Sequence, residues 1–212
     1  MWELVKAGGW LMLPLVLCSI FTVAIAVERF IRLKRSMVVP QALLLRPTPG
    51  IDSVVQHLQQ EPALKDSTLG RIFAAGYESK QHSEQFVRVQ METTASQEIG
   101  YLEKNINFLC TLSAVAPLLG LLGTVLGIIE SFLVVDLGTN SSPTLMIPGI
   151  SKALITTAAG MFIAIPALFA SRYFQRLVQE YVAELEQQAT LFHAALFYQN
   201  VDLEKHDLKK VG

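Results

Sequence analysis

Charged side chains are scarce in this sequence, and three long stretches lack them altogether. Only 17% of the 212 residues are Asp, Glu, Lys or Arg, whereas 51% are hydrophobic. The chain is therefore too apolar for an average soluble domain, and too polar for a bundle that lies wholly within a membrane. We expect one part of it to cross lipid and another part to lie in water.

The sequence also lacks the motifs of the common enzyme and metal-site classes. It has two cysteines, Cys18 and Cys110, without metal-ligand spacing, and we interpret both as small packing residues of membrane spans. It has no Gly-rich phosphate loop, no Ser-His-Asp pattern and no paired-carboxylate motif, and its four histidines are scattered. No basic patch is interleaved with aromatic residues. We therefore expect no catalysis, no cofactor, no metal and no nucleic-acid partner.

The three uncharged stretches are long enough to span a bilayer. They run from Ala7 to Val27, from Asn105 to Ile129 and from Ala153 to Ser171. A helix rises ~1.5 Å per residue, so about 20 residues cross the roughly 30 Å of hydrocarbon. The sequence therefore predicts an all-α membrane protein with three transmembrane helices.

The distribution of positive charge predicts the orientation of these spans. Of the 17 Lys and Arg residues, only Lys6 and Lys152 lie outside segments 28–104 and 172–212. Cytoplasmic segments carry the excess of Lys and Arg, so both segments are expected inside. The predicted order is an outer N-terminus (1–9), a first span (10–28), a cytoplasmic helical domain (29–106), a second span (107–135), an outer loop (136–148), a third span (149–171) and a cytoplasmic helical tail (172–212).

Helical periodicity continues into the expected cytoplasmic segments. Short helices are predicted near Ile51–Gln60 and Leu64–Ser79, between segments rich in proline. A longer helix is predicted to begin at Ser83, a suitable N-cap, and to run unbroken into the second span. Beyond the third span, apolar residues recur at intervals of four and three, which predicts a rigid helix packed on partner helices. These are Val178, Val182, Leu185, Ala189, Phe192 and Leu196.

The second and third spans each carry a face of small and hydroxyl-bearing residues. Segment 117–127 reads Pro-Leu-Leu-Gly-Leu-Leu-Gly-Thr-Val-Leu-Gly, and segment 153–160 reads Ala-Leu-Ile-Thr-Thr-Ala-Ala-Gly. Such faces either line a pore or form a seam of close helix packing, and the spacing alone leaves both open. The predicted pore-lining residues are Thr124 and Gly127 on the second span, and Ala153, Thr157, Gly160 and Ala164 on the third. Pro117 and Pro166 are interpreted as bends, for packing or for function.

These motifs together resemble a known family. They are Glu28-Arg29 with a basic cluster after the first span, segment 117–127, and segment 148–160 continued to Ala164-Ile-Pro166. In this order they are similar to the ExbB-type members of the MotA/TolQ/ExbB proton-channel family. The likeness covers nearly the whole chain, and it is most specific in the second and third spans.

The resemblance implies a homo-pentamer in the bacterial inner membrane with a central pore. It implies a periplasmic N-terminus, a cytoplasmic C-terminus, and an ExbD/TolR-type single-span partner whose helix stands in the pore and carries the titrating aspartate. It further implies that proton flow does work on the outer membrane through a TonB-like protein. Alternatives are a TolQ-like unit for envelope constriction, a MotA-like flagellar stator, which usually has four spans, and a non-conducting membrane scaffold for a partner.

One residue departs from the family pattern. Lys152 stands where ExbB-like and TolQ-like members commonly carry glutamate, so an acidic proton site is not carried over to this position. Lys152 lies ~7.5 Å outward of Thr157, and Glu130 lies ~9 Å outward of Thr124. Since the two charges are expected at similar depth, we predict that they pair and set the electrostatics of an outer vestibule. The alternative is that each extends separately to the interface.

Overall fold

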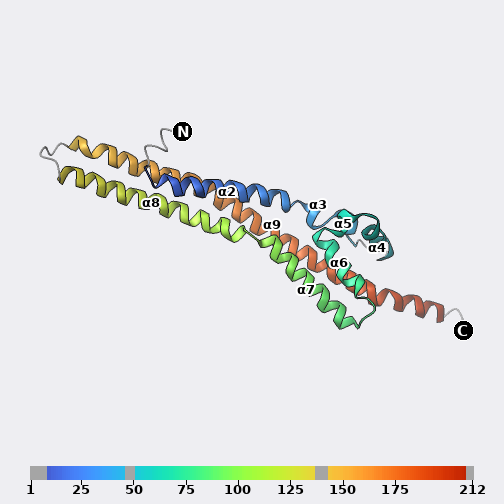
Figure 1. Cartoon of the computed structure of the whole chain (residues 1–212). Coiled ribbons are helices and arrows are strands. Elements are labelled where there is room, and N and C mark those ends of the chain that lie inside the picture. The colour runs from blue at the N-terminus through green and yellow to red at the C-terminus, as the bar shows by residue number, and fades with distance from the viewer. Residues whose placement is uncertain (1–8, 46–50, 137–142, 209–212) are drawn as a thin grey trace. The chain divides into compact units, whose positions relative to one another are not determined.

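The computed structural model describes residues 9–45, 51–136 and 143–208, and helices dominate these ranges (Figure 1). No strand occurs within them. Residues 1–8 of the expected outer N-terminus and 137–142 of the expected outer loop lie outside the described residues. The elements are α2 (Met12–Arg32), α3 (Arg35–Val38), η1 (Gln41–Leu43), α4 (Ile51–Gln60), α5 (Pro62–Lys65), α6 (Thr68–Glu78), α7 (Glu84–Glu103), α8 (Ile106–Asp136), η2 (Pro143–Met146) and α9 (Ile147–Leu208).

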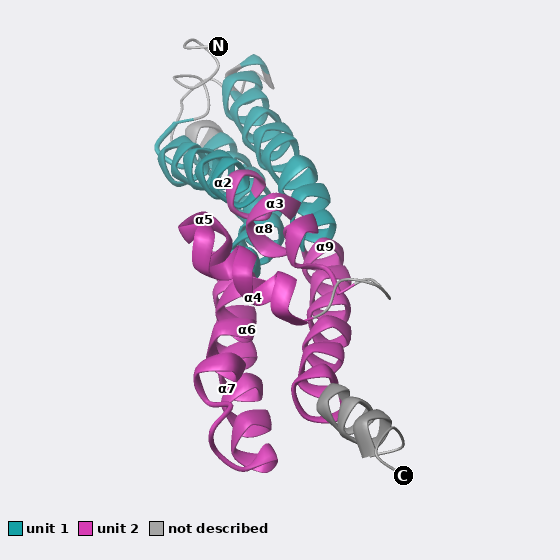
Figure 2. Cartoon of the chain, turned by 90° about the vertical axis from the view of Figure 1, so that its right-hand side faces the viewer, with its two compact units in different colours: residues 1–29, 105–174 teal, residues 30–104, 175–212 magenta. Residues whose placement is uncertain are grey.

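The chain forms two compact units, coloured separately in Figure 2. Unit 1 comprises Met1–Arg29 and Asn105–Phe174, and unit 2 comprises Phe30–Lys104 and Gln175–Gly212. Unit 1 thus holds most of α2, all of α8 and the first part of α9, which are the apolar segments of the sequence. Unit 2 holds the shorter helices, α7 and the later part of α9.

Three segments are long and apolar enough to cross a membrane: Met12–Arg32, Glu84–Leu133, which joins α7 to most of α8, and Ile147–Tyr198. Large apolar side chains of unit 1 point outward, among them Leu118, Phe162 and Phe169, which are 63%, 78% and 74% exposed. Outward apolar faces of this extent suit contact with lipid or with other membrane helices. The predicted all-α class with three candidate spans is confirmed.

The helix predicted to run unbroken from Ser83 into the second span is interrupted, so that prediction was wrong. Helix α7 ends at Glu103 and α8 begins at Ile106. Between them Asn105 has a φ of 63°, in the left-handed region that asparagine tolerates better than most residues. The Asn105 side chain also donates a hydrogen bond from Nδ2 to Glu28 Oε2 at 3.1 Å, which ties this break to α2.

Serine caps mark the starts of two helices of unit 2, α6 and α7. Helix α4 has the predicted bounds, but the helix predicted over 64–79 divides into α5 and α6. Ser67 causes the division, because its Oγ accepts a hydrogen bond from the Gly70 N–H and caps α6. Ser83 caps α7 as predicted, accepting from the Phe86 N–H at 3.4 Å.

The core of unit 2 lies where α6, α7 and α9 meet. The rings of Phe73 and Phe192 stack with centroids 4.2 Å apart, and both side chains are fully buried. Gly76 lies against Met91 and Phe192, so α6 approaches its neighbours closely. Helix α7 buries Val87, Met91, Glu98 and Leu102, whereas Phe86 and Val89 are about half exposed.

Helix α9 continues from unit 1 into unit 2 without a break, as the apolar stripe predicted. It runs from Ile147 to Leu208 and passes through Pro166, just as α8 passes through Pro117. Val178, Leu185 and Phe192 of the stripe are at most 2% exposed. The other three members, Val182, Ala189 and Leu196, are half-buried.

Candidate functional site

Helices α8 and α9 of unit 1 pack against each other through a seam of small residues. A Cβ added to Gly160 would lie 2.6 Å from the Ala116 carbonyl oxygen, and one added to Gly127 would lie 2.7 Å from the Ala153 Cβ. Only glycine lets the two backbones approach this closely. The seam comprises Ala116, Gly120, Gly123, Gly127 and Ser131 of α8, and Gly149, Ala153, Thr156 and Gly160 of α9.

The seam has an antiparallel register. Gly160 meets Ala116 and Gly120, and Gly127 meets Ala153 and Gly149. Along the seam, residue numbers therefore increase on α8 in the direction in which they decrease on α9. The spacing of four and three residues on both helices keeps each set on one face, which is the geometry that membrane helices use for close contact.

The structure places the six predicted pore-lining residues in two environments. Gly127 and Gly160 lie in the seam, Ala153 is 2% exposed and Ala164 is 6% exposed. Thr124 and Thr157 are only half-buried. A pore between subunits is a property of an assembly, so the pore-lining role of this set stays a prediction.

The two threonines form different hydrogen bonds. Thr157 Oγ1 donates to the Gly120 carbonyl oxygen at 2.8 Å and thereby joins α9 to α8. Thr124 Oγ1 donates to the Leu121 carbonyl oxygen at 2.7 Å, within its own helix. Each hydroxyl oxygen keeps lone pairs that can accept from water or from another donor.

Sequence reasoning missed two buried hydroxyls in the seam. Thr156 is 1% exposed and donates to the Ala153 carbonyl oxygen at 2.8 Å, while its side chain fills the space left by Gly123. Ser131 is 2% exposed and donates to the Gly127 carbonyl oxygen at 2.8 Å. Both fit the spacing of small residues along the seam. Of the two adjacent threonines, Thr156 is the one buried between the helices, whereas Thr157 is only half-buried. One more step of four residues after Gly127 reaches Ser131, and a step of three rather than four after Ala153 reaches Thr156.

The predicted contact between Glu130 and Lys152 is confirmed. Lys152 Nζ lies 2.8 Å from Glu130 Oε2, joining α8 and α9 near one end of the seam. The Glu130 and Lys152 side chains are 51% and 30% exposed, so the pair is accessible. Its role in an outer vestibule stays a prediction.

The start of the described chain lies against the Lys152 side chain of this ion pair. Gly9 has a φ of 71°, and its Cα approaches the Lys152 side chain so closely that a Cβ there would clash with it. Trp10, Gly123 and Thr156 line a small cavity beside Glu130 and Lys152, with a volume of about 10 Å³. This is about the volume that one water molecule needs.

The side chains of the seam can form hydrogen bonds, but none of them ionises near neutral pH. Residues 105–129 and 153–171 contain no Asp, Glu, His, Lys or Arg. Threonine and serine do not titrate near neutral pH, so they can hold water or pass on a hydrogen bond, but they cannot store a proton. Among the described residues, no cluster of His, Cys, Asp or Glu could hold a metal ion.

A sequence model of the MotA/TolQ/ExbB proton channel family matches residues 64–187. This match includes the whole seam. The chain belongs to the MotA/TolQ/ExbB proton channel family. Proteins of this family are channel and transport stator subunits of the inner membrane, and the three apolar helices make this member a multi-pass membrane protein.

Individual relatives agree with this family membership. A Synechocystis protein named putative biopolymer transport protein ExbB-like 1 is 32% identical over 202 residues, covering 91% of this chain and 78% of the relative. The Vibrio cholerae biopolymer transport protein exbB1 is 28% identical over 206 residues, covering 95% and 90%. The Haemophilus influenzae Tol-Pal system protein TolQ is 35% identical over 111 residues, about half of each chain.

Proposed function

We propose that this chain is the ExbB-like stator subunit of an inner-membrane motor driven by protons. Five copies enclose a pore, and an ExbD/TolR-type single-span partner stands in it. Movement of this partner, passed on through a TonB-like protein, energises transport across the outer membrane. The observation that carries the proposal is the close packing of α8 and α9 along the seam, with Thr124 and Thr157 half-buried among otherwise apolar side chains.

In this mechanism this chain lines the pore, and the partner provides the carboxyl group that takes up and releases the proton. The seam fixes the distance between α8 and α9, so that the two hydroxyls keep their places during turnover. Thr124 and Thr157 hold water or relay hydrogen bonds, and the partner's aspartate takes up and releases the proton. A charge that crosses 100 mV provides about 2.3 kcal/mol, which is the scale of one driving step.

The ion pair at the outer end of the seam belongs to the same proposal. Lys152 carries a positive charge where an acidic group would otherwise be expected, and Glu130 at 2.8 Å neutralises it. The pair therefore sets the electrostatics of the outer vestibule without serving as a proton store. This arrangement is consistent with a proton route that depends on the partner for its titrating group.

Proton flux in liposomes tests the proposal. The chain is reconstituted with and without its single-span partner, and flux under an imposed potential is followed with a pH-sensitive dye. We expect flux that requires both proteins and that falls in Thr124→Val. Intact assembly without partner-dependent flux would contradict the proposal.

Two other functions have specific support. The likeness to TolQ over about half the chain supports a TolQ-like stator for envelope constriction. The burial of Ala153 and Ala164 supports a non-conducting scaffold, in which the small faces serve packing alone. Partner-dependent flux excludes the scaffold. Loss of TonB-dependent uptake in a deletion strain, with normal cell constriction, distinguishes the ExbB-like role from the TolQ-like one.

A further inference from the structure

Unit 2 contains a groove that has no role in the proposed function. It lies between α7 and α9 and has a volume of about 720 Å³, within the range of roughly 300–1,000 Å³ that is usual for ligand pockets. Its lining runs from Glu84 to Ile99 on α7 and from Leu185 to Tyr198 on α9. All of these residues belong to unit 2.

The floor of the groove is apolar. Of its lining residues, Met91 and Leu185 are 4% and 1% exposed, while Ala95, Ile99 and Ala189 are half-buried. Ala95 on α7 and Ala189 on α9 both line the groove, and their short side chains leave space that larger side chains would fill. The groove can therefore take up an apolar side chain from outside.

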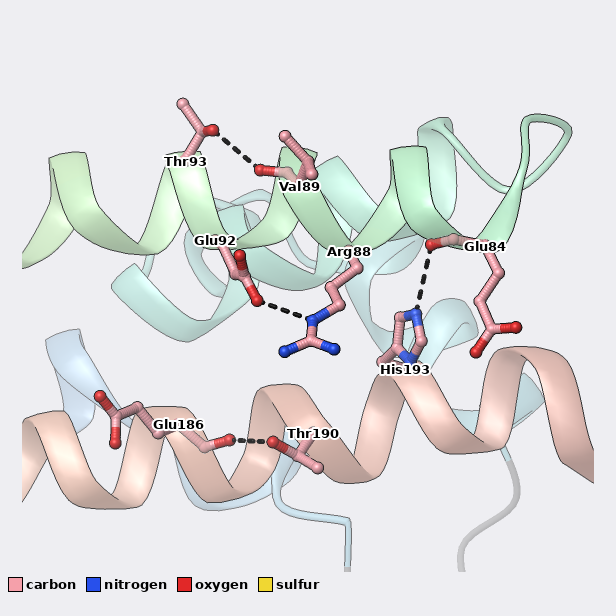
Figure 3. Close-up of polar contacts among 8 residues, drawn as sticks. All are labelled: Glu84, Arg88, Val89, Glu92, Thr93, Glu186, Thr190 and His193. Carbon is pink, nitrogen blue, oxygen red and sulfur yellow. Dashed lines mark hydrogen bonds and ion pairs between the residues drawn. The ribbon is translucent and has the colours of Figure 1, made fainter.

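The rim of the groove carries more negative than positive charge. Arg88 reaches from α7 toward α9 and pairs with Glu92, its Nε lying 2.8 Å from Oε1, so these two charges cancel (Figure 3). The remaining carboxylates are Glu84 and Glu186, one on each helix. Tyr198 donates a hydrogen bond to Glu84 Oε1 at 3.0 Å, and the charge of Glu84 also acts on Arg88. One arginine thus stands among three carboxylates, and the balance of charge at the rim is negative.

The negative rim and the apolar floor together indicate what kind of molecule the groove can bind. A negative rim repels nucleic acid and anionic lipid headgroups, whereas it attracts Lys and Arg. An apolar floor below it fits a segment in which apolar and cationic residues lie close together, docked as peptides dock in helical grooves. A single-span membrane protein exposes such a segment at its cytoplasmic end, where Lys and Arg are in excess.

We propose that the groove between α7 and α9 binds a basic, partly apolar cytoplasmic segment of the single-span partner. The inference rests on the proposed function for the existence of that partner. Glu84 and Glu186 attract the cationic residues of the segment, and Met91, Ala189 and Leu185 receive an apolar side chain. Binding of this segment in unit 2 then adds to the affinity that the partner's membrane helix contributes in the pore.

A peptide assay tests the charge and the floor separately. The probe is a short fluorescent peptide of lysine, leucine and alanine, offered to the full-length chain in nanodiscs of zwitterionic phosphatidylcholine. We expect binding that weakens about tenfold in Glu186→Lys, equivalent to about 1.4 kcal/mol, and that is lost in Ala189→Trp, which fills the floor. Glu180→Lys is the matched control, because Glu180 is exposed on the same helix and pairs with Arg176 outside the groove. Equal binding by all variants, or equal binding of a peptide with glutamate in place of lysine, overturns the inference.

Photo-crosslinking identifies the occupant in the assembled complex. A photoreactive residue in place of Thr190, which lines the groove and is exposed, is activated after the full chain is reconstituted with the single-span partner. A crosslink to the partner's cytoplasmic segment supports the inference, whereas a crosslink between two copies of this chain, or none to the partner, overturns it. Proton flux measured on the same liposomes separates the two proposals, because flux without this crosslink contradicts only the groove and a crosslink without flux contradicts only the motor.

Discussion

Gly160 shows how a single residue controls helix packing in the membrane unit. Its missing side chain lets α9 approach the backbone of α8, where the nearest atom is the Ala116 carbonyl oxygen. A backbone atom in the middle of a helix cannot move aside as the end of a flexible side chain can. The cost of adding one methyl group there is therefore a displacement of the whole helix.

Gly160→Ala is expected to destabilise the protein by about 1–3 kcal/mol, the usual range for an overpacked core. Gly100→Ala is the control, because a Cβ at Gly100 meets nothing within 4 Å. That control should be neutral or stabilising by up to about 1 kcal/mol, since alanine favours a helix over glycine. Thermal unfolding in detergent measures both. Equal stability of the two variants would mean that the α8–α9 contact is looser than described.

Thr157→Val and Thr124→Val separate packing from conduction. Thr157 joins two helices through Gly120, so its loss is expected to cost about 0.6–1 kcal/mol of stability. Thr124 bonds within its own helix, so Thr124→Val should leave stability nearly unchanged. If both hydroxyls serve the proton route, flux falls in both variants. Unchanged flux in Thr124→Val would remove that residue from the route.

Exchange of charge at Glu130 and Lys152 tests the ion pair. Glu130→Lys and Lys152→Glu each place two like charges together, and both are expected to lose activity, whereas the double variant restores it. The coupling in stability should be about 0.2–1 kcal/mol, because both side chains are accessible to solvent. Growth that depends on TonB-type uptake is the functional measurement. Without rescue in the double variant, the two charges act separately.

At the scale of elements, α7 and α9 are linked at the end of the groove by Tyr198 and Glu84. The hydrogen bond to the Glu84 carboxylate, and then its negative charge, raise the pKa of the Tyr198 phenol. A raised pKa means that the contact favours the protonated phenol. Its contribution is complete below the usual pKa of about 10 and is lost as the pH rises through the raised value.

Glu84→Gln is therefore expected to lower the pKa of Tyr198 toward that of an ordinary tyrosine. The phenolate absorbance of the full chain is followed during an alkaline titration, and the signal of Tyr198→Phe is subtracted to isolate this residue. Glu180→Gln should leave the titration unchanged. A Tyr198 titration that is the same in the unmodified chain and in the Glu84→Gln variant would show that the contact is absent in solution.

The elements differ in how well the sequence predicted them. Ile51–Gln60 and the cap at Ser83 follow from local signals that tertiary contacts do not change. The helix expected over 64–79 was divided by Ser67, a polar residue that competes for backbone hydrogen bonds. The break at Asn105 was missed because neither proline nor glycine marks it, and asparagine signals a left-handed residue only weakly.

At the scale of the whole molecule, the orientation in the membrane stays a prediction from charge. Single cysteines introduced into a chain without Cys18 and Cys110 measure it. A cysteine at position 140 is expected to react with a membrane-impermeant maleimide from the periplasmic side, and one at position 80 only after the inner membrane is opened. The reverse pattern would invert the topology, and it would place the groove of unit 2 outside.

The sequence by itself determined the number of spans, the segregation of charge and the family, because lipid requires long uncharged helices and these are visible as composition. It also indicated that Glu130 and Lys152 would meet, since both lie at similar depth. Only the tertiary structure decided which small residues are buried between α8 and α9, and that α7 and α9 leave a groove. Those outcomes depend on the rotation and register of two helices, which are set by mutual packing rather than by the composition of either one.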